Sequence, residues 1–134
     1  MVMADSEAPD PGRLEAFAIP PGRCGMILYS RSGIQAVPVF RSTDDGTALM
    51  KLEGALTALS LVGRGGETRR SVPSAQHFRG KLETGMGVTV SAVTSWGQTF
   101  PGGAYVDNGT LTVRAADGWT RVIPVAGIAG CKAE

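Results

Sequence analysis

Hydrophobic and polar residues alternate most clearly along residues 104–124. Two dipeptides that favour tight turns, Asn108-Gly109 and Asp117-Gly118, interrupt this alternation. Both tolerate the positive φ that a two-residue hairpin turn requires. We therefore predict a three-stranded antiparallel meander over 104–124, in which Val113 lies opposite Val122 on an apolar face.

The opposite face of this meander would carry Tyr105, Arg114, Arg121 and Ile123. In the same register Arg114 and Arg121 lie directly opposite each other. Like charges so placed are destabilising unless a counter-charge lies between them. The pattern thus predicts an acidic side chain or an external anion near these two arginines.

Further strand-like segments occur on the N-terminal side of the meander and after it. A loop of hairpin length at 30–33 separates two such segments, 26–29 and 34–40. Apolar and polar residues alternate over 85–96, and residues 125–130 are apolar. Pro38 has no N–H to donate, which favours a sheet edge for the strand over 34–40.

The spacing of apolar residues changes between residues 45 and 62. A cluster of helix-capping residues at 42–45 precedes apolar residues at intervals of three and four, namely Ala48, Leu49, Leu52, Ala55, Leu56 and Leu59. The scarcity of β-branched residues favours one helix here. The alternative is a hairpin with its turn at Glu53-Gly54. Residues 63–85, rich in Gly, Arg and Ser, are predicted to form a long loop.

Composition supports one mainly β domain. The chain has 134 residues, enough for a core that needs no staples, and its 19 glycines are about twice the usual share. We predict an antiparallel sandwich or partly open barrel of five to eight strands over 14–134, with one α-helix near 45–62. Residues 1–13, acidic and Pro-rich, are predicted to be a flexible arm.

Cellular location is inferred from the first residues and from the cysteines. Residues 1–13 show no apolar segment of a signal peptide, and no apolar run approaches the roughly 18 residues of a membrane span. We therefore expect a soluble protein, cytoplasmic or within an assembled particle. Cys24 and Cys131 are then expected to be reduced thiols, although a fold that brought them together would allow a bridge.

No pattern indicates a catalytic, metal or cofactor site. His77 is the only histidine, and with two distant cysteines it does not supply the four ligands of a structural zinc site. The segments 63–66 and 85–87 are glycine-rich, but neither has the context of a nucleotide-binding loop. We expect a non-enzymatic protein without cofactor.

Basic residues are the remaining candidates for binding. Five lie between 63 and 83, against two acidic residues. The candidate residues for contact with a partner or an anion are Arg64, Arg69, Arg70, Arg79, Lys81, Arg114, Arg121 and Tyr105. Apart from Phe78, no aromatic residue lies near the cluster at 63–83, so a nucleic-acid partner is possible but not favoured.

In composition the chain resembles structural proteins of phage particles and of other large assemblies. This resemblance implies a structural or assembly role with protein partners, including further copies of the chain. Two alternatives stay open. One is a ligand-binding or enzymatic β domain with a cleft near 63–85, and the other is a nucleic-acid- or anion-binding module that uses the Arg-rich segment.

Overall fold

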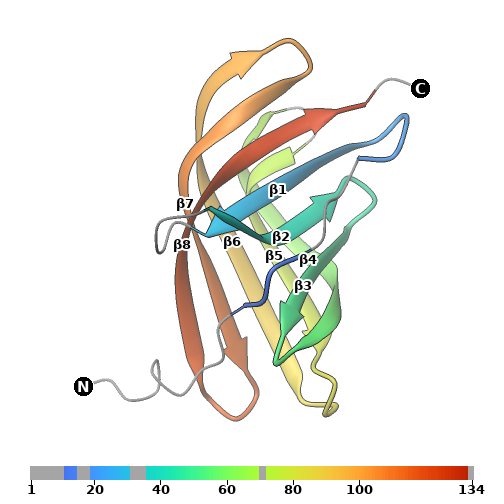
Figure 1. The fold of residues 1–134 in the computed structure, drawn as a ribbon, viewed down its shortest axis with the longest axis vertical. Coiled ribbons are helices and arrows are strands. Elements are labelled where there is room, and N and C mark those ends of the chain that lie inside the picture. Colours follow the sequence, from blue (N-terminus) through green and yellow to red (C-terminus); the bar gives the residue numbers. More distant parts are fainter. Residues whose placement is uncertain (1–10, 15–18, 31–35, 70–71, 133–134) are drawn as a thin grey trace.

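The computed structural model describes residues 11–14, 19–30, 36–69 and 72–132. Eight antiparallel strands form a closed barrel, in which each strand pairs with the next and the last pairs with the first (Figure 1). They are β1 (Cys24–Ser30), β2 (Val37–Thr43), β3 (Thr47–Leu52), β4 (Ala55–Arg69), β5 (Val72–Lys81), β6 (Gly87–Phe100), β7 (Gly103–Ala115) and β8 (Thr120–Cys131). The mainly β prediction is confirmed, and the barrel is closed rather than partly open.

Alternation along the strands fills the interior. Successive side chains of a strand point to opposite sides, so every second residue points into the barrel. The largest fully buried side chains include Met26, Leu28, Phe40, Met50, Leu52, Leu59, Phe78, Val88, Val90, Val106 and Leu111. Phe40 and Phe78 meet across the interior edge to face, with ring centroids 5.5 Å apart. An eight-stranded barrel is just wide enough for such side chains to fill it.

Closure depends on the pairing of β1 with β8. The two strands pair from Cys24 opposite Cys131 to Ser30 opposite Val125. Gly127 permits the close approach, because a Cβ atom there would lie 2.0 Å from the carbonyl oxygen of Ile27. Any larger residue would force the two strands apart at this point.

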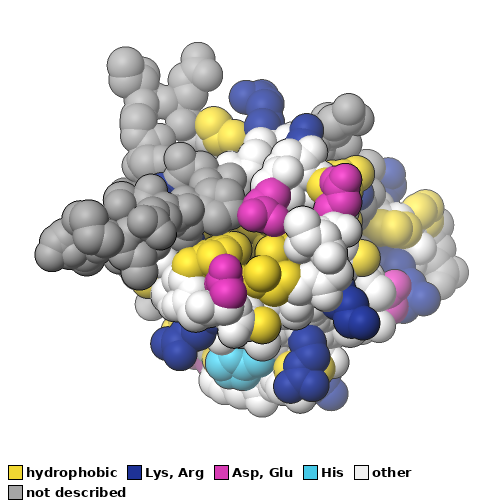
Figure 2. Space-filling view, turned by 90° about the horizontal axis from the view of Figure 1, so that it is seen from below, with side chains coloured by type: hydrophobic (Ala, Val, Ile, Leu, Met, Phe, Trp, Pro, Cys, Tyr) yellow, Lys and Arg dark blue, Asp and Glu magenta, His cyan; other side chains and the backbone are white. Residues whose placement is uncertain are grey.

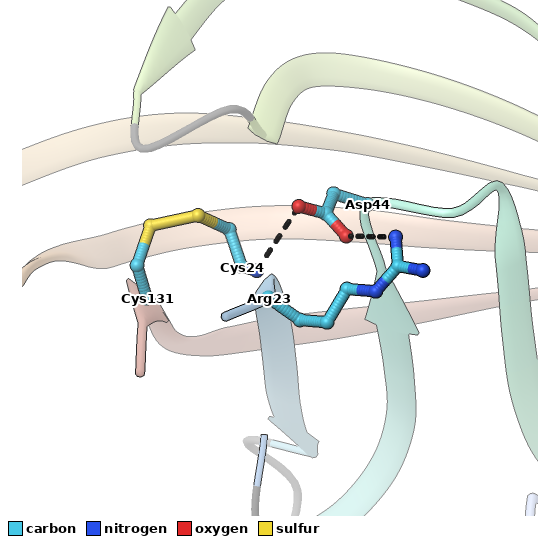
Figure 3. The surroundings of a disulfide bond; sticks show 4 residues. All are labelled: Arg23, Cys24, Asp44 and Cys131. Atoms are coloured by element: carbon cyan, nitrogen blue, oxygen red, sulfur yellow. Dashed lines mark hydrogen bonds and ion pairs between the residues drawn. A yellow bond between two sulfur atoms is a disulfide. The ribbon is translucent and has the colours of Figure 1, made fainter. Parts of the chain in front are cut away.

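A disulfide bond between Cys24 and Cys131 links β1 to β8 at one end of the barrel (Figure 3). The expectation of reduced thiols was therefore wrong. The two cysteines are 107 residues apart in sequence, and only barrel closure brings their Cα atoms to 3.9 Å. Beside the bridge, the N–H of Cys24 donates to Asp44 Oδ2 (3.1 Å), and Arg23 forms an ion pair with Asp44 (3.4 Å). The turn between β2 and β3 is thus tied to the start of β1.

The predicted helix near 45–62 is wrong, and the alternative hairpin is confirmed. β3 and β4 pair as far as Leu52 opposite Ala55, across a two-residue turn. Glu53 and Gly54 both have positive φ, 54° and 80°, as a tight hairpin turn requires. The spacing of three and four arose because apolar residues occur on both sides of the hairpin, with Ala48, Leu52 and Leu59 inside and Leu56 exposed.

The predicted loop over 63–85 is also wrong, because β4 runs to Arg69 and β5 occupies Val72–Lys81. β4 continues beyond Ser60, the last of its residues to pair with β3. Past this point the two strands extend beyond the barrel wall formed by β3. The projecting part of β4 has no buried residue, and β5 buries a Val, a Pro and a Gln there, so the hydrophobic alternation that indicates a strand is weak.

The turn at Asp117-Gly118 is confirmed, but its register is shifted by one residue. The N–H of Ala115 donates to the carbonyl of Trp119 (3.0 Å), so the loop has three residues instead of two. A shift of one residue moves every side chain of β8 to the other side. Ile123, predicted on the outer face, is therefore buried, and Val122 is exposed.

Asn108-Gly109 is not a hairpin turn, contrary to the prediction. These residues lie within β7, where Asn108 pairs with Ser95 and Gly109 with Thr94. The pairing of β7 with β8 is irregular between Val106 and Gly109, which marks a bulge. Glycine is also common in bulges, so the dipeptide alone does not distinguish the two structures.

Residues 11–14 form an N-terminal strap on the outside of the barrel (Figure 1). The N–H of Gly12 donates to the carbonyl of Lys51 (2.8 Å), and that of Leu14 to the carbonyl of Pro38 (2.9 Å). The strap thus joins β2 and β3, which pair with each other only at Arg41 and Ser42 of β2. The predicted sheet edge at Pro38 is wrong, because β2 has a neighbouring strand on each side. Pro38 itself lies outside the part of β2 that pairs with β3, so its missing N–H breaks no hydrogen bond between these two strands. The rest of the predicted arm, 1–10, lies outside the described residues.

Replacing both Cys24 and Cys131 by Ser should lower the free energy of unfolding. The chain-entropy estimate for a bridge that closes a loop this long is about 4–5 kcal/mol. Urea denaturation of oxidised wild type and of the double variant measures the difference. Reduced wild type should behave like the double variant, and equal stability of all three would show that the bridge adds nothing.

Glu53→Asn should stabilise the protein by about 0.5–1 kcal/mol, because Asn tolerates positive φ better than Glu. Gly54→Ala, at the second position of the same turn, should destabilise it by more than that. Thermal and urea unfolding of the two variants provide the comparison. A loss of stability in Glu53→Asn would contradict the assigned turn.

Candidate interaction surfaces

A small cavity beside a buried glutamine has little room for a ligand. At the end of the barrel where β4 and β5 project, a cavity of about 20 Å³ lies between residues that include Ser42, Arg64 and Gln76. This volume suffices for about one water molecule. Gln76 is 5% exposed, and its Nε2 has no hydrogen-bond partner, so a water in this cavity would satisfy it.

Two larger hollows occur among the described residues. One of about 330 Å³ lies between Pro20 and the strands β2–β4. Another, of about 460 Å³, lies between β2 and β8, and its lining includes the buried residues Ser30, Val39 and Ile123. Neither adjoins the segment 63–85, where a cleft was predicted.

Three of the predicted basic residues come together on one outer surface. Arg79 and Lys81 of β5 point outward on the same side, and Arg114 lies two strands away with Thr89 of β6 between them. The exposed His77 of β5 adjoins them, and its Nδ1 is 2.9 Å from Ser91 Oγ. We call Arg79, Lys81, Arg114 and His77 the basic face. Figure 2 shows Lys and Arg side chains on both sides of the histidine.

The other predicted site residues lie elsewhere. Arg64 and Arg69 belong to the projecting end of β4, where Arg69 forms an ion pair with Glu67. Arg121 lies opposite Val113, not opposite Arg114, so the predicted Arg114–Arg121 pair is wrong and follows from the register shift of β8. Arg70 lies outside the described residues.

Repulsion within the basic face is weak. Arg79 and Arg114 lie two strands apart, about 10 Å. Two charges at that separation repel by about 0.4 kcal/mol in water, and salt screens this further. The barrel therefore tolerates the basic face without a counter-ion. The notable property of the basic face is that it brings several hydrogen-bond donors together on one surface.

A second surface, over β1, β7 and β8, carries no charge. We call it the uncharged face. It consists of Ile27, Tyr29, Tyr105, Val122, Pro124, Ala126 and Ile128. Ile128 lies between Ile27 and Tyr105, and the Tyr105 ring packs on Phe100 with centroids 4.9 Å apart. Val122 is 53% exposed and Tyr105 49% exposed, so this face presents substantial apolar surface to solvent.

The sequence predicted only part of the uncharged face. Tyr105 was assigned correctly to the outside of the meander. Val122 was assigned to the core because of the register error. One signal was available, because alternate residues from Thr120 to Gly130 include no charged residue, whichever face they occupy.

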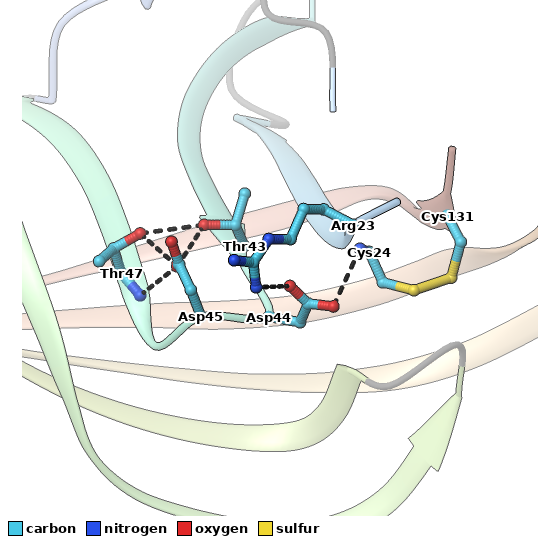
Figure 4. A network of polar contacts seen from close by, with 7 residues as sticks. All are labelled: Arg23, Cys24, Thr43, Asp44, Asp45, Thr47 and Cys131. Atoms are coloured by element: carbon cyan, nitrogen blue, oxygen red, sulfur yellow. Dashed lines mark hydrogen bonds and ion pairs between the residues drawn. A yellow bond between two sulfur atoms is a disulfide. The ribbon is translucent and has the colours of Figure 1, made fainter. Parts of the chain in front are cut away.

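The turn between β2 and β3 contains the described carboxylate whose pKa shifts clearly (Figure 4). Asp45 Oδ1 accepts hydrogen bonds from the hydroxyls of Thr47 (2.6 Å) and Thr43 (2.7 Å) and from the N–H of Thr47 (3.1 Å). These bonds, the Thr47 hydroxyl first among them, favour the ionised form and lower the pKa of Asp45.

Within the described ranges, no group of three or more His, Cys, Asp or Glu side chains could hold a metal ion. No helix in this part of the chain is long and apolar enough to cross a membrane. Comparison of the chain with protein-family models, curated proteins and solved structures found no match.

Acid should destabilise the protein partly through Asp45. Its pKa is lowered in the folded state, so its stabilising contribution is present above the unfolded pKa near 3.9 and is lost as the pH falls through the folded value. Asp45→Asn keeps an accepting oxygen but cannot titrate. Between pH 5 and pH 2 we therefore expect wild type to lose more thermal stability than Asp45→Asn.

Thr47→Val removes the hydroxyl that lowers the Asp45 pKa most. Its loss of thermal stability between pH 5 and pH 2 should be smaller than that of wild type and larger than that of Asp45→Asn. The same pH dependence in wild type and Asp45→Asn would contradict this role of the turn.

Proposed function

We propose that the protein is a non-enzymatic structural component that associates with further copies of itself through the uncharged face. The observation that carries this proposal is the outer side of β8. From Thr120 to Gly130 its outward residues include no charge, and both neighbouring strands add apolar residues to the same surface.

Barrel closure supports contact through a face. An open sheet can add a strand from another molecule along its whole edge, whereas closure leaves only projecting strand ends unpaired, such as β4 beyond Ser60. Closure therefore favours association through outward side chains. Exposed contiguous apolar surface is typical of protein contact sites.

Self-association is favoured by the contrast between the two sides of the barrel. The described outward residues of β5 include three charged or titratable side chains, His77, Arg79 and Lys81. An uncharged face gains little from contact with such a surface. It fits the same face of a second copy, and a two-fold axis would create that contact. Membership of a phage particle or another large assembly, which the composition suggests, would add further contacts.

Val122→Lys should weaken self-association about tenfold or more, because the contact would bury an unpaired charge. Sedimentation equilibrium over a wide concentration range measures the association constant. Val62→Lys is the matched control. Val62 is 59% exposed on β4, away from the uncharged face, and its replacement should leave association unchanged.

Thermal unfolding of both variants shows whether the barrel is intact. Wild type that stays monomeric at high concentration would refute self-association through this face. Equal weakening by Val122→Lys and Val62→Lys would assign association to charge in general and not to the uncharged face.

A further inference from the structure

The basic face has a regular layout that follows from strand register. One row crosses three neighbouring strands, with Arg79 of β5 beside Thr89 of β6 and Thr89 beside Arg114 of β7. The next row places Ser91 between His77 and Thr112. Hydroxyl groups therefore occupy the middle of a surface with basic side chains on both sides.

The acidic residues nearest to this surface in sequence are Glu83, in the turn after Lys81, and Asp117, in the turn after β7. β5 and β6 contain no acidic residue along their whole length. The ion pairs of Arg23 with Asp44 and of Arg69 with Glu67 do not involve Arg79, Lys81 or Arg114. The donors of the basic face are therefore available to an external ligand.

Arginine is well suited to phosphate, because its planar guanidinium group donates two parallel hydrogen bonds to neighbouring oxygens. Arg79 and Arg114 lie about 10 Å apart at their Cα atoms. Their long side chains can reach towards each other above Thr89, whose hydroxyl is a further donor. Lys81, about 7 Å from Arg79 along β5, adds a charge for a second phosphate.

We infer that the basic face binds ligands that carry two or more phosphate groups. Two sources share this chemistry, a free diphosphate and the backbone of duplex nucleic acid. Single-stranded nucleic acid is less suited, because the rows of the basic face include no Phe, Tyr or Trp for base stacking. The inference does not rest on self-association, because Arg79, Lys81 and Arg114 do not belong to the uncharged face, although the two faces adjoin where Thr112 lies opposite Val122.

The test uses the full chain, with pyrophosphate and a labelled 20-bp duplex as separate probes at low salt. Arg79→Gln/Arg114→Gln should weaken binding at least tenfold. For the duplex, it should also reduce the slope of log K against log salt by about 2, since each lost phosphate contact removes about 0.9. Arg64→Gln/Lys132→Gln removes the same charge from the other end of the barrel and should have little effect.

Thr89→Glu separates binding from folding. A carboxylate between the two arginines would pair with them inside the protein, so we expect phosphate binding to be lost while thermal stability is kept or raised. Loss of stability in this variant would contradict the layout of the row.

Binding of pyrophosphate with no tighter binding of the duplex would support the face as a site for free diphosphate. Binding of the duplex alone would support recognition of a nucleic-acid backbone. Binding of neither probe would overturn the inference, as would equal weakening by the Arg79/Arg114 and Arg64/Lys132 double variants.

Discussion

The pairing of β1 with β8 is the contact on which the rest of the structure depends, because it converts a meander of eight strands into a closed barrel. It requires Gly127 at the point of closest approach, and the Cys24–Cys131 bridge holds it at one end. Without this pairing, β1 and β8 would both be sheet edges with unsatisfied backbone groups. Closure also encloses Phe40 and Phe78, which meet from strands that are not neighbours.

A filled interior restricts where function can lie. Fully buried apolar side chains occupy the middle of the barrel, and the cavity beside Gln76 has room for about one water molecule. Apart from the hollow of about 460 Å³ between β2 and β8, which reaches Ile123, the surface available to ligands and partners consists of outward residues. Strand alternation divides these into continuous rows, since each strand contributes every second residue. The basic face and the uncharged face are built from such rows, and they adjoin at β7, where Thr112 lies opposite Val122.

The local sequence pattern was sufficient to predict most of the strands, but it was insufficient to predict how the strands pair with one another. Alternation correctly located strands at 26–29, 85–96 and 125–130. It failed at 45–62, where apolar residues on both sides of a hairpin imitated helical spacing, and at 63–85, where the projecting end of β4 buries no residue. Closure and the disulfide could not be predicted, because they depend on the combined register of eight strands. The basic face needed the same information, since Arg79 and Arg114 are neighbours only through Thr89.

The three-residue turn after Ala115 shows how strongly such local detail controls the surface. With a two-residue turn, Val122 would point into the barrel and Arg121 would point out beside Arg114. The outer row of β8 would then carry a charged residue, and Val122 would pack in the core opposite Val113. The observed turn exchanges both positions, so that Ile123 fills the core and Val122 joins the uncharged face. The surface proposed for self-association therefore exists because one extra residue lies in a turn.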